Sequence, residues 1–533
     1  MLFVIELITV SILLGFFTFA IRLPFLIVPC GDNAITWWII NRHRNSNKIE
    51  YAVPDSIVPG VLGYPPLQYF VVSRFPQKYW AAIANFSNLA YDSFAVVIAY
   101  LCTTLFFVSQ EQEQPQILAI WVAVLYATAP LLLPVTARLN GIKAQSLGSL
   151  ISLVYFVSLG AAYVYGFHVF YLVAAFCVIL SILSSAFSIQ NIAFVSVLLS
   201  VFYLDWIPVT VFIGGVLLGL AIPPLGILKV LKFKLNHTLF LHRNRAGMVY
   251  GLDKAHRISD LFALPFLLFR RPDQFMHLAL NKNSYASVIL NLPIFLLLCF
   301  WLISRQDLAG FFLENSTTRY SLMVVLAGFV LFLVTSQQPL VSMGPGDRYL
   351  GEYSFPFIAF LAVVAMAHYE ISPISMLYVL LMQLSMVALA FTYMVRGDVA
   401  RELKKPFSDK ADEQIAEHLQ NFEESQKILV VPLKSSFVLS AKVDRPSIKF
   451  YHQWVSNGDS GFAYQQQDSE SYNWPRREFA YFWEKYGVDT VVVRRNSLTK
   501  EKLEQLVAAN DWPKTYENEE YTVYRKQQAV GSS

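Results

Sequence analysis

The sequence has few charged residues for its length. Only 15% of its 533 residues are Asp, Glu, Lys or Arg, whereas soluble domains contain about 25%. The net charge of +4 is small and dispersed, so the composition does not indicate a nucleic-acid partner. No glycine-rich Walker or dinucleotide-binding motif occurs, which argues against an enzyme that uses ATP or a nucleotide sugar.

The sequence also lacks the pattern of a disulfide framework or a metal centre. It has four cysteines and no C-x-x-C or Cys/His cluster, so we expect the cysteines to be packing residues. The histidines of the most basic segment, His237, His242 and His256, are spaced by 5 and 14 residues. That spacing does not place ligands together on one helix face. No cofactor is indicated, although a divalent metal stays possible.

Long apolar runs are abundant. Hydrophobic residues make up 55% of the chain and the mean hydropathy is +0.46. A helix of about 20 apolar residues crosses a bilayer, and lipid offers backbone groups no partner outside a helix or a closed barrel. We therefore predict about eleven transmembrane helices, near residues 2–21, 86–108, 117–136, 147–167, 169–186, 188–204, 207–228, 285–303, 320–336, 354–369 and 373–395.

The chain changes character after residue 395, where charge density rises and long apolar runs end. We predict a transmembrane domain over 1–395 and a small soluble α/β domain over 396–533. Patterns in this tail predict helices around Ile415 to Phe422 and over 498–509, buried strands at 428–431 and 491–493, and an edge strand at 521–524.

Three connections are long or polar enough to contain a site, at 22–85, 229–284 and 337–353. With eleven spans, all three share one membrane side with the tail. That side is rich in Lys and Arg, and the positive-inside rule would make it cytoplasmic. The rule applies to short loops, however, and an enzyme that binds a lipid phosphate also needs cations there. The charge pattern alone leaves the sidedness open.

The first of these loops contains the most suggestive residues. Asp32 follows the first span by about ten residues, an aromatic and basic stretch follows at 37–44, and Gly-Tyr-Pro-Pro-Leu-Gln-Tyr-Phe occupies 63–70. A carboxylate at the bilayer surface can act as the general base that deprotonates a hydroxyl acceptor. The alternative is that Asp32 only caps a short surface helix.

This order of a span, an acidic residue, an aromatic helix and Pro65-Pro66-Leu67 resembles the first external loop of the GT-C glycosyltransferase superfamily. The branch that contains protein O-mannosyltransferases and lipid A aminoarabinose transferases is the most similar, and Arg-Tyr-Leu-x-x-Tyr at 348–353 is similar to its bacterial members. The chain departs from many relatives in having Asn33 after Asp32 and Tyr64 before Pro65.

The resemblance implies an inverting glycosyltransferase with a GT-C-like helical domain. Its donor would be a sugar linked to dolichyl or undecaprenyl phosphate, and its acceptor a hydroxyl of a glycan, a lipid or a protein. Asp32 would be the catalytic base. The site would face the periplasm or cell exterior from a bacterial inner or plasma membrane. This contradicts the literal charge rule, and we follow the resemblance.

A leaving phosphate needs cations, and Arg binds its oxygens with two parallel hydrogen bonds. The candidates for the donor phosphate are Arg138, Lys143, Arg243, Arg245 and Arg348, and those for the substrate loop are Tyr64, Pro65, Pro66 and Tyr69. The alternative for the basic residues is an anchor at lipid headgroups, and Arg348 could instead pair with Asp347.

Two other functions fit a multi-span protein. Transporters tend to place charges or Gly/Pro breaks in mid-membrane and often show repeats, whereas here the charges fall mainly in loops and no repeat is visible. A polymerase or ligase of surface polysaccharide also has many spans and Arg-rich external loops, and it stays an alternative.

Overall fold

The computed structural model describes residues 2–27, 33–44, 46, 48–54, 56–130, 144–243, 258–337, 340, 343–344, 346–396, 410–422, 425–433, 435–443, 445, 447–452, 469–471, 474–475, 479–495 and 512–526. The chain divides into two compact units. Unit 1 comprises residues 1–30, 77–227 and 252–404, and unit 2 comprises 31–76, 228–251 and 405–533. Unit 2 therefore joins the predicted soluble tail to parts of two predicted loops.

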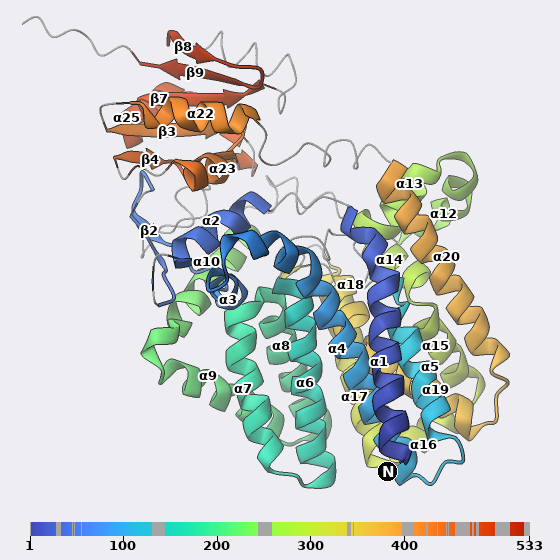
Figure 1. Cartoon of the computed structure of the whole chain (residues 1–533). Helices are drawn as coiled ribbons and strands as arrows, with labels where there is room; N and C mark the ends of the chain where they lie inside the picture. Colours follow the sequence, from blue (N-terminus) through green and yellow to red (C-terminus); the bar gives the residue numbers. More distant parts are fainter. Residues whose placement is uncertain are drawn as a thin grey trace, which may run out of the picture. The chain divides into compact units, whose positions relative to one another are not determined.

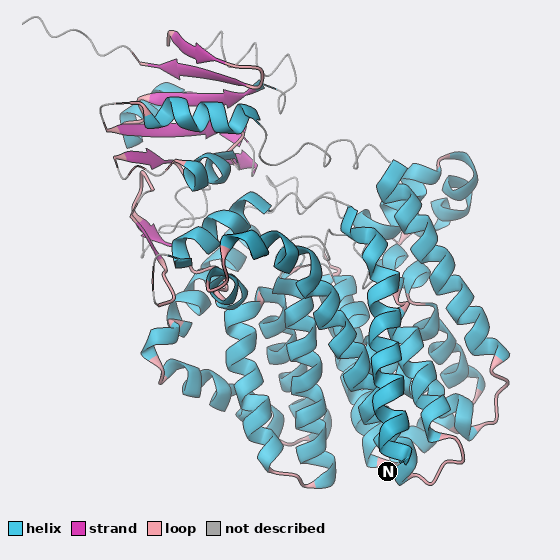
Figure 2. Cartoon of the chain, in the orientation of Figure 1, coloured by secondary structure: helices cyan, strands magenta, loops and turns pink. Residues whose placement is uncertain are grey.

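Unit 1 is a bundle of apolar helices (Figures 1 and 2). Six helices in the described residues are long and apolar enough to cross a membrane, and up to nine spans result if each bent helix pair counts as one. The six are α1 (Leu2–Arg22), α4 (Trp80–Ser109), α6 (Ala144–Tyr165), α8 (Ala186–Tyr203), α17 (Ser316–Thr335) and α20 (Ile374–Arg396).

Other apolar helices of the bundle are short or bent. The bent pairs include α14 (Ser284–Asn291) with α15 (Pro293–Ser304), at 81°, and the segment Gly346–Tyr353 with α19 (Phe355–His368), at 54°. The remaining elements of unit 1 are η1 (Leu23–Ile27), η2 (Gln77–Tyr79), α5 (Pro115–Ala127), α7 (Val169–Ser184), α9 (Ile207–Leu220), η4 (Pro223–Leu225), α12 (Ser259–Arg270), α13 (Pro272–His277), η5 (Leu278–Lys282) and α16 (Leu308–Glu314).

The predicted spans can be compared with these helices. Each of the eleven predicted ranges overlaps a helix of the described residues, which confirms helices at these places. Residues 131–136 of the third predicted span lie outside the described residues. Length and composition support six to nine crossings, and the number eleven stays a prediction. The predicted loop 337–353 is partly helical, because α18 (Gly346–Arg348) and the π-helical turn η7 (Tyr349–Tyr353) lead directly into α19.

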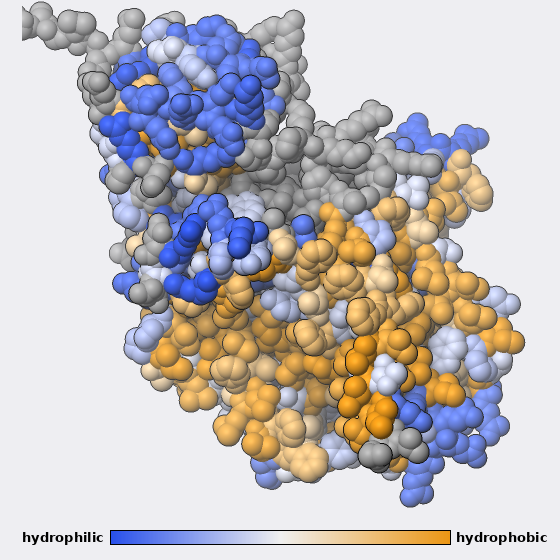
Figure 3. Space-filling model, viewed as in Figure 1, coloured by the Kyte–Doolittle hydropathy of each residue, from blue (hydrophilic) through white to orange (hydrophobic). Residues whose placement is uncertain are grey.

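The surface of the bundle is apolar over a wide area in the view of Figure 3. Phe16 of α1, Leu172 of α7 and Phe300 of α15 are each more than 60% exposed. Soluble monomers rarely expose contiguous apolar surface beyond a few hundred Å². The exposed side chains of this unit therefore suit a lipid environment.

Unit 2 contains a mixed five-stranded sheet in the order β4-β3-β7-β9-β8. Strand β3 (Gln426–Val431) is parallel to β4 (Ile448–Phe450) and to β7 (Thr490–Arg494), while β9 (Tyr521–Arg525) is antiparallel to β7 and to β8 (Lys514–Glu517). The helices are α22 (Lys410–Gln420), α23 (Ser435–Lys442) and α25 (Phe479–Tyr486), and a small ribbon pairs β5 (Ser469–Ser471) with β6 (Trp474–Pro475).

The sheet has a hydrophobic core on each face. Ile415 and Leu419 of α22 pack with Leu439 of α23 in one core, while Phe479 and Phe482 of α25 lie in the other. Burial of such side chains is the main favourable term in folding. The helix around residue 415 and the strands at 428–431 and 491–493 are thereby confirmed, as is the α/β character of the tail.

The strand predicted at 521–524 is present as β9 (Tyr521–Arg525), but its predicted position in the sheet was wrong. Residues 521–524 were expected at an edge of the sheet, but β9 lies between β7 and β8. Its side chains Tyr521 and Val523 are fully buried, because the short strand β8 pairs with it and forms the edge instead. The predicted helix over 498–509 lies outside the described residues.

The first-loop part of unit 2 comprises α2 (Asn33–Arg44), β1 (Ala52–Val53), β2 (Gly60–Val61) and α3 (Leu67–Ser73). It packs against α10 (Ile227–Arg243) at Gly63, where the two backbones approach closely. A Cβ atom on Gly63 would lie 2.3 Å from the Cβ of Phe233 and 2.8 Å from the carbonyl oxygen of Lys229. Only glycine fits this position without displacement of the helix.

We predict that Gly63→Ala destabilises the protein by about 1–3 kcal/mol, because the added methyl group overpacks the contact with α10. The measurement is the thermal unfolding midpoint of the detergent-solubilised chain. Gly214→Ala in α9 is the matched control, since a Cβ there meets nothing within 4 Å. An unchanged midpoint in Gly63→Ala would show that the contact is not tight.

Candidate functional site

The predicted site residues fall into two groups. Asp32, Arg138, Lys143 and Arg245 lie outside the described residues, and Arg243 ends α10 with its side chain outside them. Those that the structure describes are Tyr64, Pro65, Pro66 and Tyr69 in unit 2 and Arg348 in unit 1. The polar and aromatic contacts of the two units are described separately below.

The predicted substrate loop forms one packed group in unit 2. The rings of Tyr64 and Tyr69 lie 5.9 Å apart, with 47° between their planes. Pro66 precedes the first residue of α3, and its carbonyl oxygen accepts a hydrogen bond of 2.8 Å from the amide of Phe70. Pro66 has no amide hydrogen, and an amide at a helix start has no acceptor within the helix, so proline is tolerated here. Tyr69 is buried, whereas Tyr64 is partly exposed.

Cations lie over aromatic rings along the same loop. Arg42 lies 5.1 Å from the ring centre of Trp38, and Arg74 lies 4.3 Å from that of Phe70. Arg42 also donates to the carbonyl oxygen of Ala52, and Arg74 donates to that of His43 at 3.2 Å. These contacts fix the guanidinium groups, so the loop presents ordered positive charge.

His43 lies between these arginines and is almost completely buried. Its Nδ1 accepts a hydrogen bond of 3.2 Å from the amide of Glu50. Burial and the neighbouring charges of Arg42 and Arg74 lower its pKa to about 4. The imidazole is therefore neutral at physiological pH and acts as an acceptor that orders residues 43–50.

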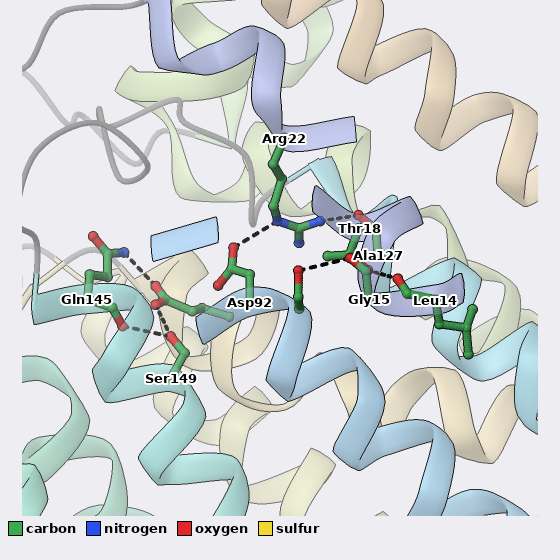
Figure 4. A network of polar contacts seen from close by, with 10 residues as sticks. Leu14, Gly15, Thr18, Arg22, Asp92, Ala127, Gln145 and Ser149 are labelled. Atoms are coloured by element: carbon green, nitrogen blue, oxygen red, sulfur yellow. Dashed lines mark hydrogen bonds and ion pairs between the residues drawn. The ribbon is translucent and has the colours of Figure 1, made fainter. Parts of the chain in front are cut away.

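Unit 1 contains a buried ion pair near the end of α1 (Figure 4). The Nε atom of Arg22 lies 2.8 Å from a carboxylate oxygen of Asp92 on α4, and another guanidinium nitrogen donates to the carbonyl oxygen of Ala127 at 2.6 Å. Arg22 is 1% exposed and Asp92 is 5% exposed. The pair links α1, α4 and α5, and it fixes the point where the chain leaves α1 for the first loop.

A second carboxylate, Glu352, is buried in the Arg-Tyr-Leu-x-x-Tyr segment. It accepts a hydrogen bond of 2.7 Å from Gln145 and another from Ser149, both on α6 (Figure 4). Buried polar side chains at membrane depth commonly mark functional sites. The contact holds Glu352 against the first turns of α6, which begins at Ala144.

Arg348 lies one turn before Glu352 and is partly exposed. Its guanidinium lies 4.7 Å from the ring centre of Phe187. The carboxylate of Asp347 accepts hydrogen bonds from Ser284 at 3.1 Å and from Ser287 at 3.2 Å. Within the described residues no carboxylate is paired with Arg348, so the alternative of an Asp347–Arg348 pair is not the arrangement observed.

Several residues of these clusters were not singled out in the sequence. Arg22 was counted only as a loop charge, and neither Asp92 nor Glu352 was considered. Asp92 did leave a signal, because it is a charged residue inside an otherwise apolar run. Charges within a span usually face the bundle interior and have a partner there.

The described clusters supply groups that bind rather than groups that react. Ordered guanidinium groups suit phosphate oxygens, and the partly exposed ring of Tyr64 suits the face of a sugar or a prenyl chain. Among the described residues, no group of three or more His, Cys, Asp and Glu side chains could hold a metal ion. The described cysteines Cys102, Cys177 and Cys299 are free thiols.

Comparisons with known proteins identify the fold. No family model and no curated protein matches the sequence. The structure is similar to the crystal structure of an Archaeoglobus fulgidus oligosaccharyltransferase in complex with zinc and sulfate, with a TM-score of 0.53 and 12% identity over 94% of this chain and 70% of that chain. It is also similar to the oligosaccharyltransferase AglB of that organism in complex with an inhibitory peptide and dolichol-phosphate, with a TM-score of 0.52 and 12% identity over 92% and 69% of the two chains.

The two neighbours have the GT-C fold, so the likeness confirms a GT-C-like fold for this chain. Membership of the GT-C superfamily stays a prediction. The identity of 12% supports the fold alone. The O-mannosyltransferase and aminoarabinose transferase branch stays a prediction.

We predict that Asp92→Ala destabilises the protein by about 3–5 kcal/mol, because it leaves the Arg22 charge buried without its carboxylate. The thermal midpoint of the solubilised chain measures this.

The double variant Arg22→Met, Asp92→Leu should recover most of the loss, since two apolar side chains replace the pair. Glu413→Ala is the control, because this carboxylate is 71% exposed in its pair with Lys442 and should leave the midpoint unchanged. A midpoint for Asp92→Ala equal to that control would contradict the structural role.

We predict that His43 makes stability depend on pH between about 6.5 and 4. Because its folded pKa is lowered to about 4, the unfolded chain binds more protons in this window. The contribution of neutral His43 to the free energy of unfolding is fully present above pH 6.5. It falls by up to about 3 kcal/mol as the pH decreases through this window. His43→Gln should remove this part of the pH dependence of the thermal midpoint, whereas His168→Gln, at an exposed position, should leave it intact. Parallel profiles for wild type and His43→Gln would disprove the assignment.

Proposed function

We propose that this chain, which has a GT-C fold, is an integral-membrane glycosyltransferase that moves a sugar from a polyprenyl-phosphate donor to a hydroxyl group. The observation that carries the proposal is the likeness to oligosaccharyltransferases over 94% of the chain. One of these neighbours was solved with dolichol-phosphate, a lipid of the donor class inferred from the first loop. The acceptor would be a glycan, a lipid or a protein.

In the proposed reaction the acceptor oxygen attacks the anomeric carbon from the face opposite the lipid phosphate. The bond from the anomeric carbon to the phosphate oxygen breaks, and the configuration inverts. Asp32 takes the proton of the acceptor hydroxyl, and polyprenyl phosphate leaves with the bonding electron pair. A positioned general base of this kind contributes about 10²–10⁴-fold to the rate.

The leaving phosphate gains negative charge, and cations stabilise it. Arg348 is suited to this role because its guanidinium is held over Phe187 and is not neutralised by Asp347. We propose that Arg138, Lys143, Arg243 and Arg245 add to this binding, because all four lie in loops that the span prediction places on the same membrane side. A bidentate guanidinium contact also orients the phosphate, which a lysine cannot do.

The first loop would contact the sugar or the prenyl chain. Tyr64 is partly exposed and its ring centre lies 5.9 Å from that of Tyr69. We propose that the exposed part of Tyr64 contacts the sugar or the prenyl chain. Pro65 and Pro66 are buried and set the direction in which α3 leaves the loop. In line with the GT-C resemblance, we propose that this side of the membrane is the periplasmic or extracellular one.

The test is transfer from a radiolabelled polyprenyl-phosphate sugar by the purified full chain. We predict that Asp32→Asn lowers kcat at least 100-fold, because an amide cannot accept the hydroxyl proton. Asp205→Asn is the matched control. Asp205 accepts a hydrogen bond of 3.0 Å from the amide of Ile207 in a turn between helices, which Asn can also accept, so activity should be unchanged. Full activity of Asp32→Asn would remove Asp32 as the base.

A further inference from the structure

We infer that the C-terminal α/β domain is a docking module that positions the first loop. The first loop occupies the edge of the sheet where domains of this topology commonly bind a ligand. The structural part of this inference stands by itself, and its catalytic consequence rests on the proposed function. Trp38, Ser56 and Ile57 of the first loop make the contacts on which the inference rests.

The topology of the sheet defines that edge. From β3 the chain passes through α23 to β4 on one side of β3, and then returns to β7 on the other side. All three strands are parallel, so their carboxyl ends lie at one edge. The connection after β3 leads to β4 on one side, whereas β7 lies on the other side of β3, so the strand order reverses between β3 and β7. Open parallel sheets bind their ligands outside the carboxyl ends of the strands, where the strand order reverses.

The first loop reaches this edge at the end of β4. Ser56 forms a parallel bridge with Phe450, and the amide of Ile57 donates to the Phe450 carbonyl oxygen at 3.0 Å. The side chain of Ile57 is 8% exposed and belongs to the same core as Val431 and Tyr451, which lie at the ends of β3 and β4. Residues 56–57 therefore complete the core of the domain.

Trp38 of α2 makes the second contact. It is 2% exposed, and its ring centre lies 5.1 Å from that of Phe437 and 4.8 Å from that of His452. His452 stacks on Phe437 at 4.9 Å, and its Nδ1 lies 3.2 Å from the hydroxyl of Ser436. An indole, a phenyl ring and an imidazole thus form one buried cluster between α2 and α23, which pack against each other.

The cluster fixes the direction of α2. The helix begins at Asn33, and the proposed base Asp32 is the residue before it in the sequence. On its other side the first loop is packed on α10 through Gly63. Trp38 and Phe437 are in this view positioning residues, and displacement of a reacting group by about 1 Å can cost 10²-fold in rate.

The test combines hydrogen exchange with kinetics on the full chain. In Trp38→Ala and in Phe437→Ala we expect the amides of 33–44 to exchange at least tenfold faster, while those of β3 and β7 stay protected and show that the domain is folded. Transfer from the polyprenyl-phosphate sugar should fall at least tenfold in kcat with little change in KM for the donor. Trp38→Phe, which keeps a ring in the cluster, should restore much of both. Trp206→Ala is the control, because Trp206 is 78% exposed in unit 1.

The two proposals fail in different ways. If wild type transfers no sugar but Phe437→Ala loosens α2, the docking is supported and the proposed function fails. If wild type transfers sugar and Trp38→Ala changes neither the exchange of α2 nor kcat, the docking role is overturned. Equal losses in Trp38→Phe and Trp38→Ala would also contradict it, since the ring contact would then not be what positions the helix.

Discussion

The burial of charge among apolar helices is the constraint on which the polar structure of unit 1 depends. A charged group in such surroundings is costly unless a partner compensates it. Arg22 therefore lies against Asp92, Asp347 against two serines, and Glu352 against a serine and a glutamine. Each of these contacts joins segments that are distant in the sequence, so the same requirement that avoids an isolated charge also holds α1 against α4 and the Glu352 segment against α6.

The first loop has a comparable role in unit 2. Its glycine at position 63 allows close contact with α10, while Trp38 and Ile57 pack on the α/β domain. Three segments that are remote in the chain thereby fold as one unit. The aromatic and basic residues of the loop contribute in two ways, since Trp38 is part of the buried cluster and also lies beneath the guanidinium of Arg42.

Much of the fold could be predicted because its signals are local. The apolar runs predicted the helices, and the short runs of β-branched residues predicted β3 and β7. The strand at 521–524 was misplaced because the charged and aromatic residues of β8 carry no apolar alternation, although β8 covers β9. In the candidate site, the contact between Tyr64 and Tyr69 follows from their place in one short motif. Asp32, Arg138, Lys143 and Arg245 lie outside the described residues, so their roles stay predictions.

The sequence by itself determined that this chain is a helical membrane protein with an α/β tail, and it pointed to the GT-C fold through the first loop. Length, apolar content and side-chain periodicity are properties of neighbouring residues, so they can be seen without coordinates. Only the tertiary structure decided that the tail packs on the first loop and that Arg22 pairs with Asp92. Trp38 and Phe437 are about 400 residues apart, and their contact depends on the packing of the whole unit. No local pattern records such a contact, because it forms only when both surfaces are already folded.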